Sequence, residues 1–125
     1  NFDISELVDN CLAKNTNKKI KILNENNFNN EDSIVILRTF QYKLKRIQKI
    51  AEDFKKNGNL EKSISNAKPP VFWKDKEIVK QQIKKWEVHE IKQLIFNIND
   101  MELEIKKNLK NSLYLATDFI MNNVS

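Results

Sequence analysis

Residues that break or turn helices are rare in this 125-residue sequence, which contains one glycine, Gly58, and two prolines. This scarcity disfavours low-complexity chains, collagen and turn-rich all-β sandwiches. The Walker A loop and the dinucleotide-binding fingerprint each need at least two glycines where the backbone approaches phosphate. We therefore expect no ATP binding of the usual kind.

Long apolar runs and export signals are also missing. No stretch approaches the roughly 18 apolar residues that a membrane span needs, and the N-terminus has no basic segment followed by an apolar one. The single cysteine, Cys11, cannot form an internal disulfide, and its apolar neighbours predict a small buried side chain in a reducing compartment. The sequence predicts a soluble, cytoplasmic protein without a membrane role.

Catalytic and metal-binding patterns are equally scarce. His89 is the only histidine, so together with one cysteine it cannot complete a zinc site, and we expect it on the surface or at a helix start. Burial of Cys11 would raise its thiol pKa and lower its reactivity. The acids Asp100, Glu102 and Glu104 alternate around one helix instead of converging. We predict no catalytic site, no metal and no cofactor in residues 1–125.

Hydrophobic residues, 40% of the chain, recur at three- and four-residue spacing and predict a single all-α domain of five main helices plus short turns. Asp3, Thr16 and Ser112 are the expected caps of three of these helices. Gly58 is placed to close the longest helix in left-handed geometry. The five main helices are expected at 3–15, 32–56, 75–86, 88–109 and from 112 onward, with a short helix at 16–23 and a helical turn at 60–64.

Charge is distributed unevenly along the chain. Residues 38–85 carry 14 basic against 5 acidic groups, whereas the segments before and after them are each slightly acidic. On the long helix, five residues form a basic outer row opposite the apolar stripe: Arg38, Tyr42, Lys45, Lys49 and Lys56. Such a surface suits phosphate or an acidic partner, but solvated lysine-rich helix faces give the same pattern.

The most unusual chemistry lies in residues 68–76, where a stiff proline pair precedes two aromatic residues among lysines. Stacking surfaces combined with positive charge are typical of single-stranded nucleic-acid contacts. Alternatively, Phe72 and Trp73 plug the gap between two helices while the lysines face water. One ring can also be buried and the other presented. The candidate nucleic-acid-binding residues are Lys68, Phe72, Trp73, Lys74, Lys76 and Lys80.

The order of these elements resembles the C-terminal domain of the bacterial DNA polymerase III delta subunit. The stretch from Leu37 to Arg46 is similar to that family's L-x-R-x-x-x-x-L-x-R helix. Residues 68–76 resemble its R-P-P-V-F-F-K-x-K segment, with Lys68 in place of Arg and Trp73 in place of the second aromatic residue. Trp86 matches the tryptophan that ends the next helix. Residues 101–106 are similar to its A-E-x-x-L-K segment, and a departure from the family follows Lys106.

This resemblance implies a part of the clamp loader that places the sliding clamp on primed DNA during replication. In that family the domain forms one segment of a five-membered collar and does not hydrolyse ATP. Its partners are the ATPase subunits of the gamma or tau type, the delta-prime type subunit, and the sliding clamp, which is reached through the N-terminal domains. The resemblance further implies that residues 1–125 are the C-terminal part of a longer protein. Primer-template DNA is a further expected partner of the basic aromatic segment.

Three classes of function are compatible with these features. A collar domain needs apolar surface beyond its own core, for which the candidates are Val35, Ile36, Ile95, Leu103 and Leu115. A stand-alone helical nucleic-acid-binding module would use the basic middle segment and bind DNA tightly with a steep salt dependence. An enzyme is disfavoured, since no catalytic constellation is present.

Overall fold

The computed structural model describes residues 2–124, and every regular element within them is helical. The helices are α1 (Phe2–Leu12), α2 (Thr16–Glu25), α3 (Asn30–Asn57), α4 (Leu60–Ser65), the 3-10 helix η1 (Trp73–Asp75), α5 (Lys76–Lys85), α6 (Val88–Lys107), the 3-10 helix η2 (Leu109–Asn111) and α7 (Ser112–Asn123). The predicted all-α class is confirmed. The described residues form seven α-helices instead of five, because the short segments α2 and α4 are complete helices. None of these helices is both long and apolar enough to cross a bilayer.

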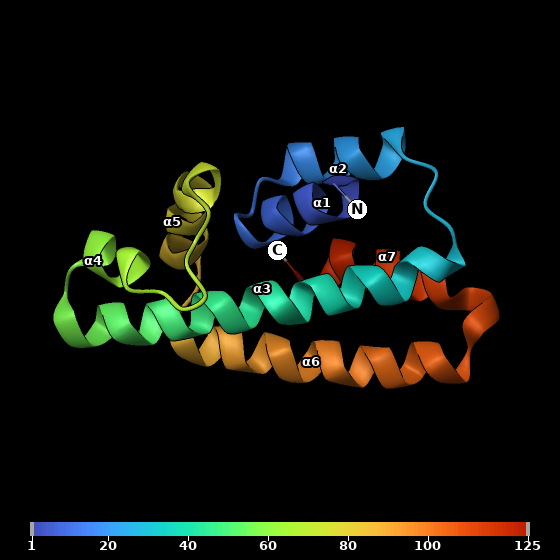
Figure 1. The fold of residues 1–125 in the computed structure, drawn as a ribbon. Coiled ribbons are helices and arrows are strands. Elements are labelled where there is room, and N and C mark those ends of the chain that lie inside the picture. Colours follow the sequence, from blue (N-terminus) through green and yellow to red (C-terminus); the bar gives the residue numbers. More distant parts are fainter. Residues whose placement is uncertain (1, 125) are drawn as a thin grey trace.

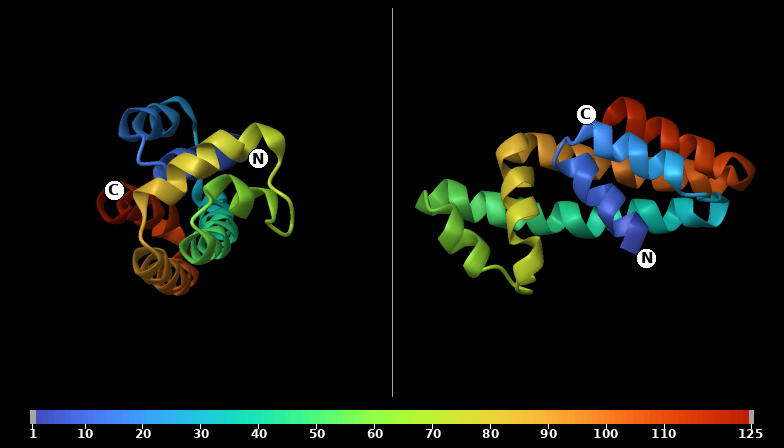
Figure 2. Two further views of the ribbon diagram at one scale, coloured as in Figure 1. Left: turned by 90° about the vertical axis from the view of Figure 1, so that its left-hand side faces the viewer. Right: turned by 90° about the horizontal axis from the view of Figure 1, so that it is seen from above.

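The longest helix, α3, is the centre of the fold. It runs antiparallel to α6 along the length of the molecule (Figure 1), and the two are joined by a hydrogen bond of 2.9 Å from Gln41 Nε2 to Asn99 Oδ1. Arg38 and Glu102 form a 3.5 Å ion pair further along the same seam. Helices α1, α2 and α5 lie on the side of α3 away from α6, and α5 crosses α3 steeply (Figure 2). Helix α3 thus contacts α1, α4, α5, α6 and α7.

One continuous apolar core joins these helices, and the predicted stripes account for most of it. The stripe on α3 is buried at Leu37, Phe40, Leu44, Ile47 and Ala51, and that on α6 at Ile91, Leu94, Ile98 and Ile105. Leu109, at the end of the segment 88–109 that was predicted to be one helix, is exposed. Because α6 ends at Lys107, Leu109 begins a 3-10 turn and leaves the helical register.

Helix ends show where local sequence signals succeed and fail. Gly58 has φ 71° and terminates α3 in left-handed geometry, as predicted. The predicted caps Asp3, Thr16 and Ser112 are wrong, since each lies inside its helix, in the first turn. Ser112 is buried and donates to the carbonyl of Leu109 at 2.9 Å, which ties α7 to the preceding turn.

Two buried lysines join helices that are distant in sequence. Lys19 on α2 is almost completely buried, and its Nζ donates to the carbonyl oxygen of Ile120 on α7 at 3.3 Å. Lys43 on α3 is also buried, and its Nζ lies 2.8 Å from Asp9 Oδ1 on α1. Gln82 of α5 donates to the same Asp9 oxygen at 3.1 Å. Asp9 therefore links α1, α3 and α5 through one carboxylate.

Candidate nucleic-acid interface

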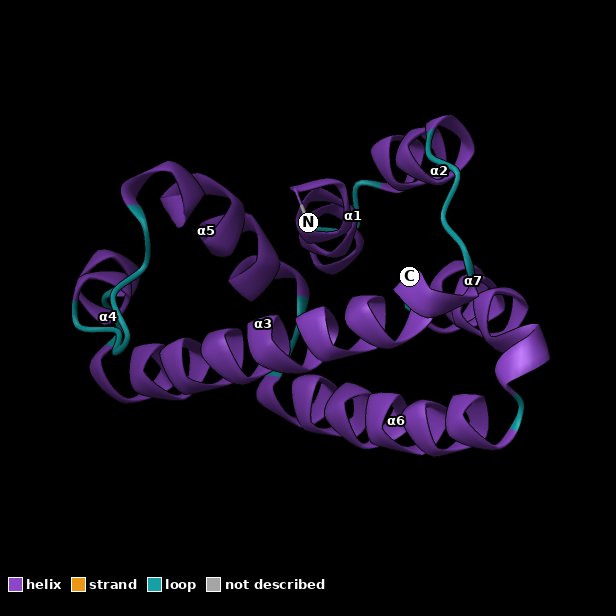
Figure 3. Cartoon of the chain, turned by 45° about the vertical axis from the view of Figure 1, so that its right-hand side comes forward, coloured by secondary structure: helices purple, strands orange, loops and turns teal. Residues whose placement is uncertain are grey.

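The basic aromatic segment forms the connection between α4 and α5, drawn as a loop in Figure 3. Pro69 and Pro70 favour extended backbone in the residues before them, and the segment has no helix until η1 starts at Trp73. Val71 is buried and packs into the core. This anchor fixes the start of the segment and leaves the following two aromatic residues at the surface.

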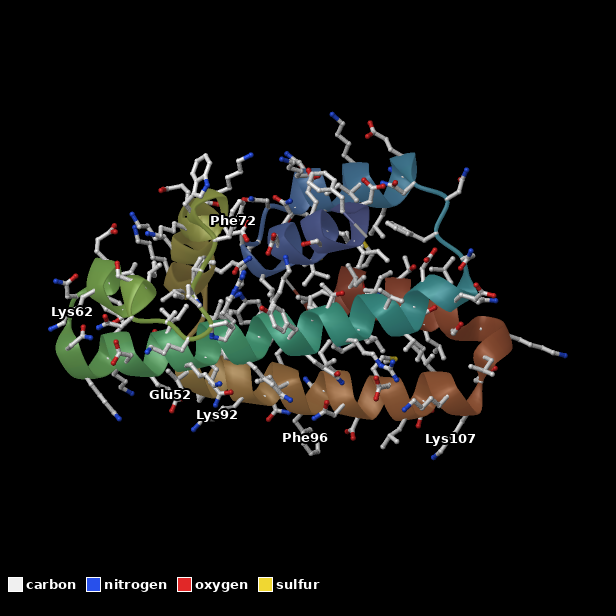
Figure 4. All side chains as sticks on the ribbon, in the orientation of Figure 1. Glu52, Lys62, Phe72, Lys92, Phe96 and Lys107 are labelled. Carbon is white, nitrogen blue, oxygen red and sulfur yellow. The ribbon has the colours of Figure 1, made fainter. Side chains whose placement is uncertain are left out.

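Phe72 and Trp73 both face solvent, with exposed fractions of 56% and 68%. Their ring centroids are 5.9 Å apart with an interplanar angle of 49°, and Lys74 Nζ lies 5.4 Å from the centroid of the Trp73 ring. Both alternatives that bury a ring, either by plugging a gap between helices or with only one ring presented, are wrong, because both rings are exposed. Figure 4 shows Phe72 at the α4–α5 connection. The segment presents two aromatic faces beside a cation.

The lysines predicted to join these rings fall into two groups. Lys68, Lys74 and Lys76 are exposed. Lys80 instead forms ion pairs with Glu61 of α4 and with Glu77, and the hydrogen bond to Glu61 is the main cause of its raised pKa. Lys80 therefore bridges α4 and α5, whereas the other three ammonium groups are presented to solvent. Binding of nucleic acid by this set stays a prediction.

The outer row predicted on α3 is exposed, and it borders a cavity that the sequence analysis missed. Arg38, Tyr42, Lys45, Lys49 and Lys56 all face solvent. A cavity of 470 Å³ lies between the second half of α3, the end of α4 and the residues that follow α4. No single stretch of sequence contains its lining, which forms only when α4 folds back at Gly58. The only sequence feature that pointed to the cavity was the spacing of Tyr42, Lys45 and Lys49, which lie within two helical turns of one another in the outer row.

Trp86, the tryptophan that follows α5, has a structural role. Its Nε1 donates to the carbonyl oxygen of Leu12 at 2.7 Å, and Lys14 Nζ lies 4.2 Å from the centroid of its ring. The ring packs against the core. Trp86 therefore satisfies a carbonyl at the end of α1 and fixes the α5–α6 junction against it.

The side chains considered as catalytic or metal-binding groups are buried, exposed singly or held in ion pairs. Cys11 is buried, and the loss of solvation raises the pKa of its thiol to about 12, so it is almost entirely protonated at neutral pH. His89 is exposed in the first turn of α6, as expected. Glu102 is engaged by Arg38 and, at 3.4 Å, by Lys106. In the part of the chain that the structure describes, no three histidine, cysteine or acidic side chains are grouped as metal ligands would be.

Of the five apolar residues expected to lie outside the core, two are exposed and three are buried or partly buried. Ile36 is wrong, since it is fully buried on α3, and Ile95 and Leu115 are partly buried against the core. Val35 and Leu103 are exposed. Phe96 was not among these candidates, but it is 59% exposed on α6. Its neighbours Leu94 and Ile98 fill the buried face of the helix, so Phe96 lies on the opposite face.

Comparisons with known proteins give no assignment: no family matches the chain, no curated protein matches it, and no solved structure matches it.

Proposed function

We propose that this chain is a non-catalytic subunit-assembly domain of the type found at the C-terminus of the DNA polymerase III delta subunit, and that it forms one segment of a clamp-loader collar. Its partners are then ATPase subunits of the gamma or tau type and a delta-prime type subunit. The sliding clamp is reached through domains that precede residue 1. The motif resemblance over nearly the whole chain names this family, and the all-α fold is compatible with it.

The observation that carries an assembly role is the outer face of α6. Phe96 and Leu103 are 59% and 56% exposed, and their seven-residue spacing places them on the same face, two turns apart. In Figure 4 Phe96 points away from α3, together with Lys92 and Lys107. The core is complete without these two side chains. Paired large apolar residues on an exposed helix face fit a partner helix better than they fit water.

A co-elution experiment tests the assembly role. We expect full-length protein carrying Phe96→Asp and Leu103→Asp to bind its clamp-loading ATPases at least about tenfold more weakly, because each carboxylate must be desolvated against an apolar partner. Size-exclusion chromatography of the mixed subunits, followed by titration, measures the loss. A Tyr114→Asp variant, which alters an aromatic residue exposed on α7, is the matched control and should assemble normally.

Two outcomes reject the assembly role. The first is failure of the unaltered full-length protein to co-elute with those ATPases. The second is normal assembly by the doubly substituted protein when circular dichroism shows that it is folded.

In this proposal, the exposed rings at the α4–α5 connection contact primer-template DNA held by the assembled complex. Phe72→Ala with Trp73→Ala should weaken that binding about fivefold or more, because stacking of one base on an aromatic ring contributes about 1–3 kcal/mol. Fluorescence anisotropy of labelled primer-template, measured with the intact complex over a series of salt concentrations, reports the change. Unchanged affinity across the whole series, in a folded double variant, contradicts the contact.

A stand-alone nucleic-acid-binding module is the second candidate, and the exposure of Phe72 and Trp73 beside three exposed lysines favours it. The two functions differ in what the isolated chain does. A stand-alone module binds DNA tightly by itself with a steep salt dependence, whereas a collar domain alone binds weakly and needs its partners.

A further inference from the structure

The cavity between α3 and α4 has a strongly basic lining. Lys45, Arg46 and Lys49 border it from α3, and Lys68 borders it from the segment that follows α4. The one acidic side chain in the lining is Asp53, which accepts a hydrogen bond of 2.9 Å from Asn57. Four cations against one carboxylate produce a positive potential inside a concave site, where low-dielectric walls strengthen it.

Arg46 is the most informative member of this lining. Its side chain is mostly buried, with its Nη2 4.0 Å from Asp9 Oδ1, beyond hydrogen-bonding distance. Its Nε and Nη2 are buried and have no hydrogen-bond partner among the described residues. A guanidinium group carries five donors in a fixed planar fork, which suits the oxygens of a phosphate. Arg46 therefore adds a positive charge to the lining of the cavity, while its Nη2 also forms an ion pair with Asp9.

The rest of the lining fits the flat, apolar part of a nucleotide. Tyr42 is more than half exposed at the cavity, and Ile50, Ala67 and Pro69 supply apolar contacts. The volume of 470 Å³ lies within the range of pockets that bind small organic ligands. An acidic peptide would use the cations but would have no use for the aromatic ring, so the combination favours a nucleotide.

The cavity is also close in sequence to the exposed aromatic pair. Pro69 lines the cavity and Phe72 follows three residues later, a separation of at most about 10 Å of extended backbone. The cavity therefore has the Tyr42 ring on its α3 side, and the chain that leaves it at Pro69 carries Lys74 and the exposed rings of Phe72 and Trp73. Positive charge combined with aromatic rings is how proteins bind a single strand, by contacting its backbone while its bases stack.

We propose that the α3–α4 cavity binds single-stranded nucleic acid, with a phosphate among Lys45, Arg46, Lys49 and Lys68 and a base against the ring of Tyr42. This site involves a surface of α3 that is separate from the α6 face used for assembly. It stands whether or not the chain joins a clamp loader, since binding of a strand and binding of ATPase subunits are measured independently.

The test is the binding of a fluorescein-labelled oligothymidylate of roughly ten nucleotides to the 125-residue chain at low salt, followed by fluorescence anisotropy. We expect weak binding by the unaltered chain, with a Kd on the order of 10⁻⁴ M. Lys45→Gln with Lys49→Gln should lower the affinity about tenfold or more. It should also make the plot of log K against log salt less steep by about 0.7, because the contact with the one phosphate held in the cavity is lost.

The matched control removes the same charge far from the cavity. Lys21 on α2 and Lys110 in η2 are both exposed, and η2 lies at the opposite end of α3 from α4 (Figure 1). Lys21→Gln with Lys110→Gln should leave the affinity within about twofold of the unaltered value. Tyr42→Ala keeps every charge and should lower the affinity at least about fivefold through loss of stacking.

Three results overturn this inference. The first is an equal loss of affinity in the cavity and control variants, which indicates a general charge effect. The second is no binding of the oligonucleotide at roughly 1 mM chain, well above the expected Kd, and the third is a poly-glutamate peptide that binds more tightly than the oligonucleotide and is unaffected by Tyr42→Ala. Circular dichroism of each variant verifies its fold. Arg46 is left unaltered because it also contributes to the buried contacts of Asp9.

Discussion

Replacing Asp9 with alanine should lower the free energy of unfolding by about 3–5 kcal/mol, because it leaves a buried ammonium group without its counter-charge. Lys43 Nζ lies 2.8 Å from Asp9 Oδ1, and the side chains are only 8% and 14% exposed. Lys43 keeps the hydroxyl and carbonyl oxygens of Ser5, at 2.7 and 3.2 Å, but neither carries a negative charge. Gln82 also loses an acceptor. Urea unfolding followed by circular dichroism measures the change.

A more exposed ion pair, between α1 and α2, is the control for this prediction. Lys18 and Glu6 are 3.5 Å apart and their side chains are 57% and 31% exposed, so Lys18→Ala should cost no more than about 1 kcal/mol. Combining Asp9→Leu with Lys43→Met removes the buried carboxylate and the buried ammonium group and should recover part of the loss, because Arg46 still loses its counter-charge. If Asp9→Ala were as mild as Lys18→Ala, the cluster would not hold α1, α3 and α5 together.

Phe40→Ala should lower the free energy of unfolding by about 3–5 kcal/mol through the cavity that it leaves in the core. The Phe40 side chain is fully buried near the middle of α3, the helix that contacts five others. Little space can be refilled by its neighbours, because they are held by their own helices. Thermal and urea unfolding of the variant give the magnitude.

The matched substitution lies on α6, where Phe96 is mostly exposed. Phe96→Ala should change stability by less than about 0.5 kcal/mol, because the ring has little packing to lose. Similar losses in the two variants would mean that the Phe96 ring is also part of the core. That result would remove the observation on which the assembly proposal depends.

The fold was largely predictable because the spacing of apolar residues and the residues that end helices agree along most of the chain. Each stripe of apolar residues on α3 and α6 is long enough to fix the helical face, and Gly58 marks the end of α3 unambiguously. Single caps were less predictable, because serine, threonine and aspartate are also common inside the first helical turn. Ser112 is such a case, since its hydroxyl serves the preceding turn.

The candidate site was only partly predictable. Charge and aromatic composition identify the segment around Phe72, but its exposure depends on Val71 filling the core first. The cavity requires α3 and the end of α4 to meet in space. The contact of Asp9 with Lys43 joins positions 34 residues apart, and an isolated lysine on a helix gives no sign of its partner.

The hydrogen bond from Lys19 to the carbonyl of Ile120 makes the order of the two ends of the chain interdependent. If α7 detached, an ammonium group that is now covered would lose both its acceptor and its packing, and α2 would loosen with it. We therefore expect α2 and α7 to open together, whereas helices near opposite ends of a chain usually fray independently. Extensions of the chain should be best tolerated where they leave this link intact.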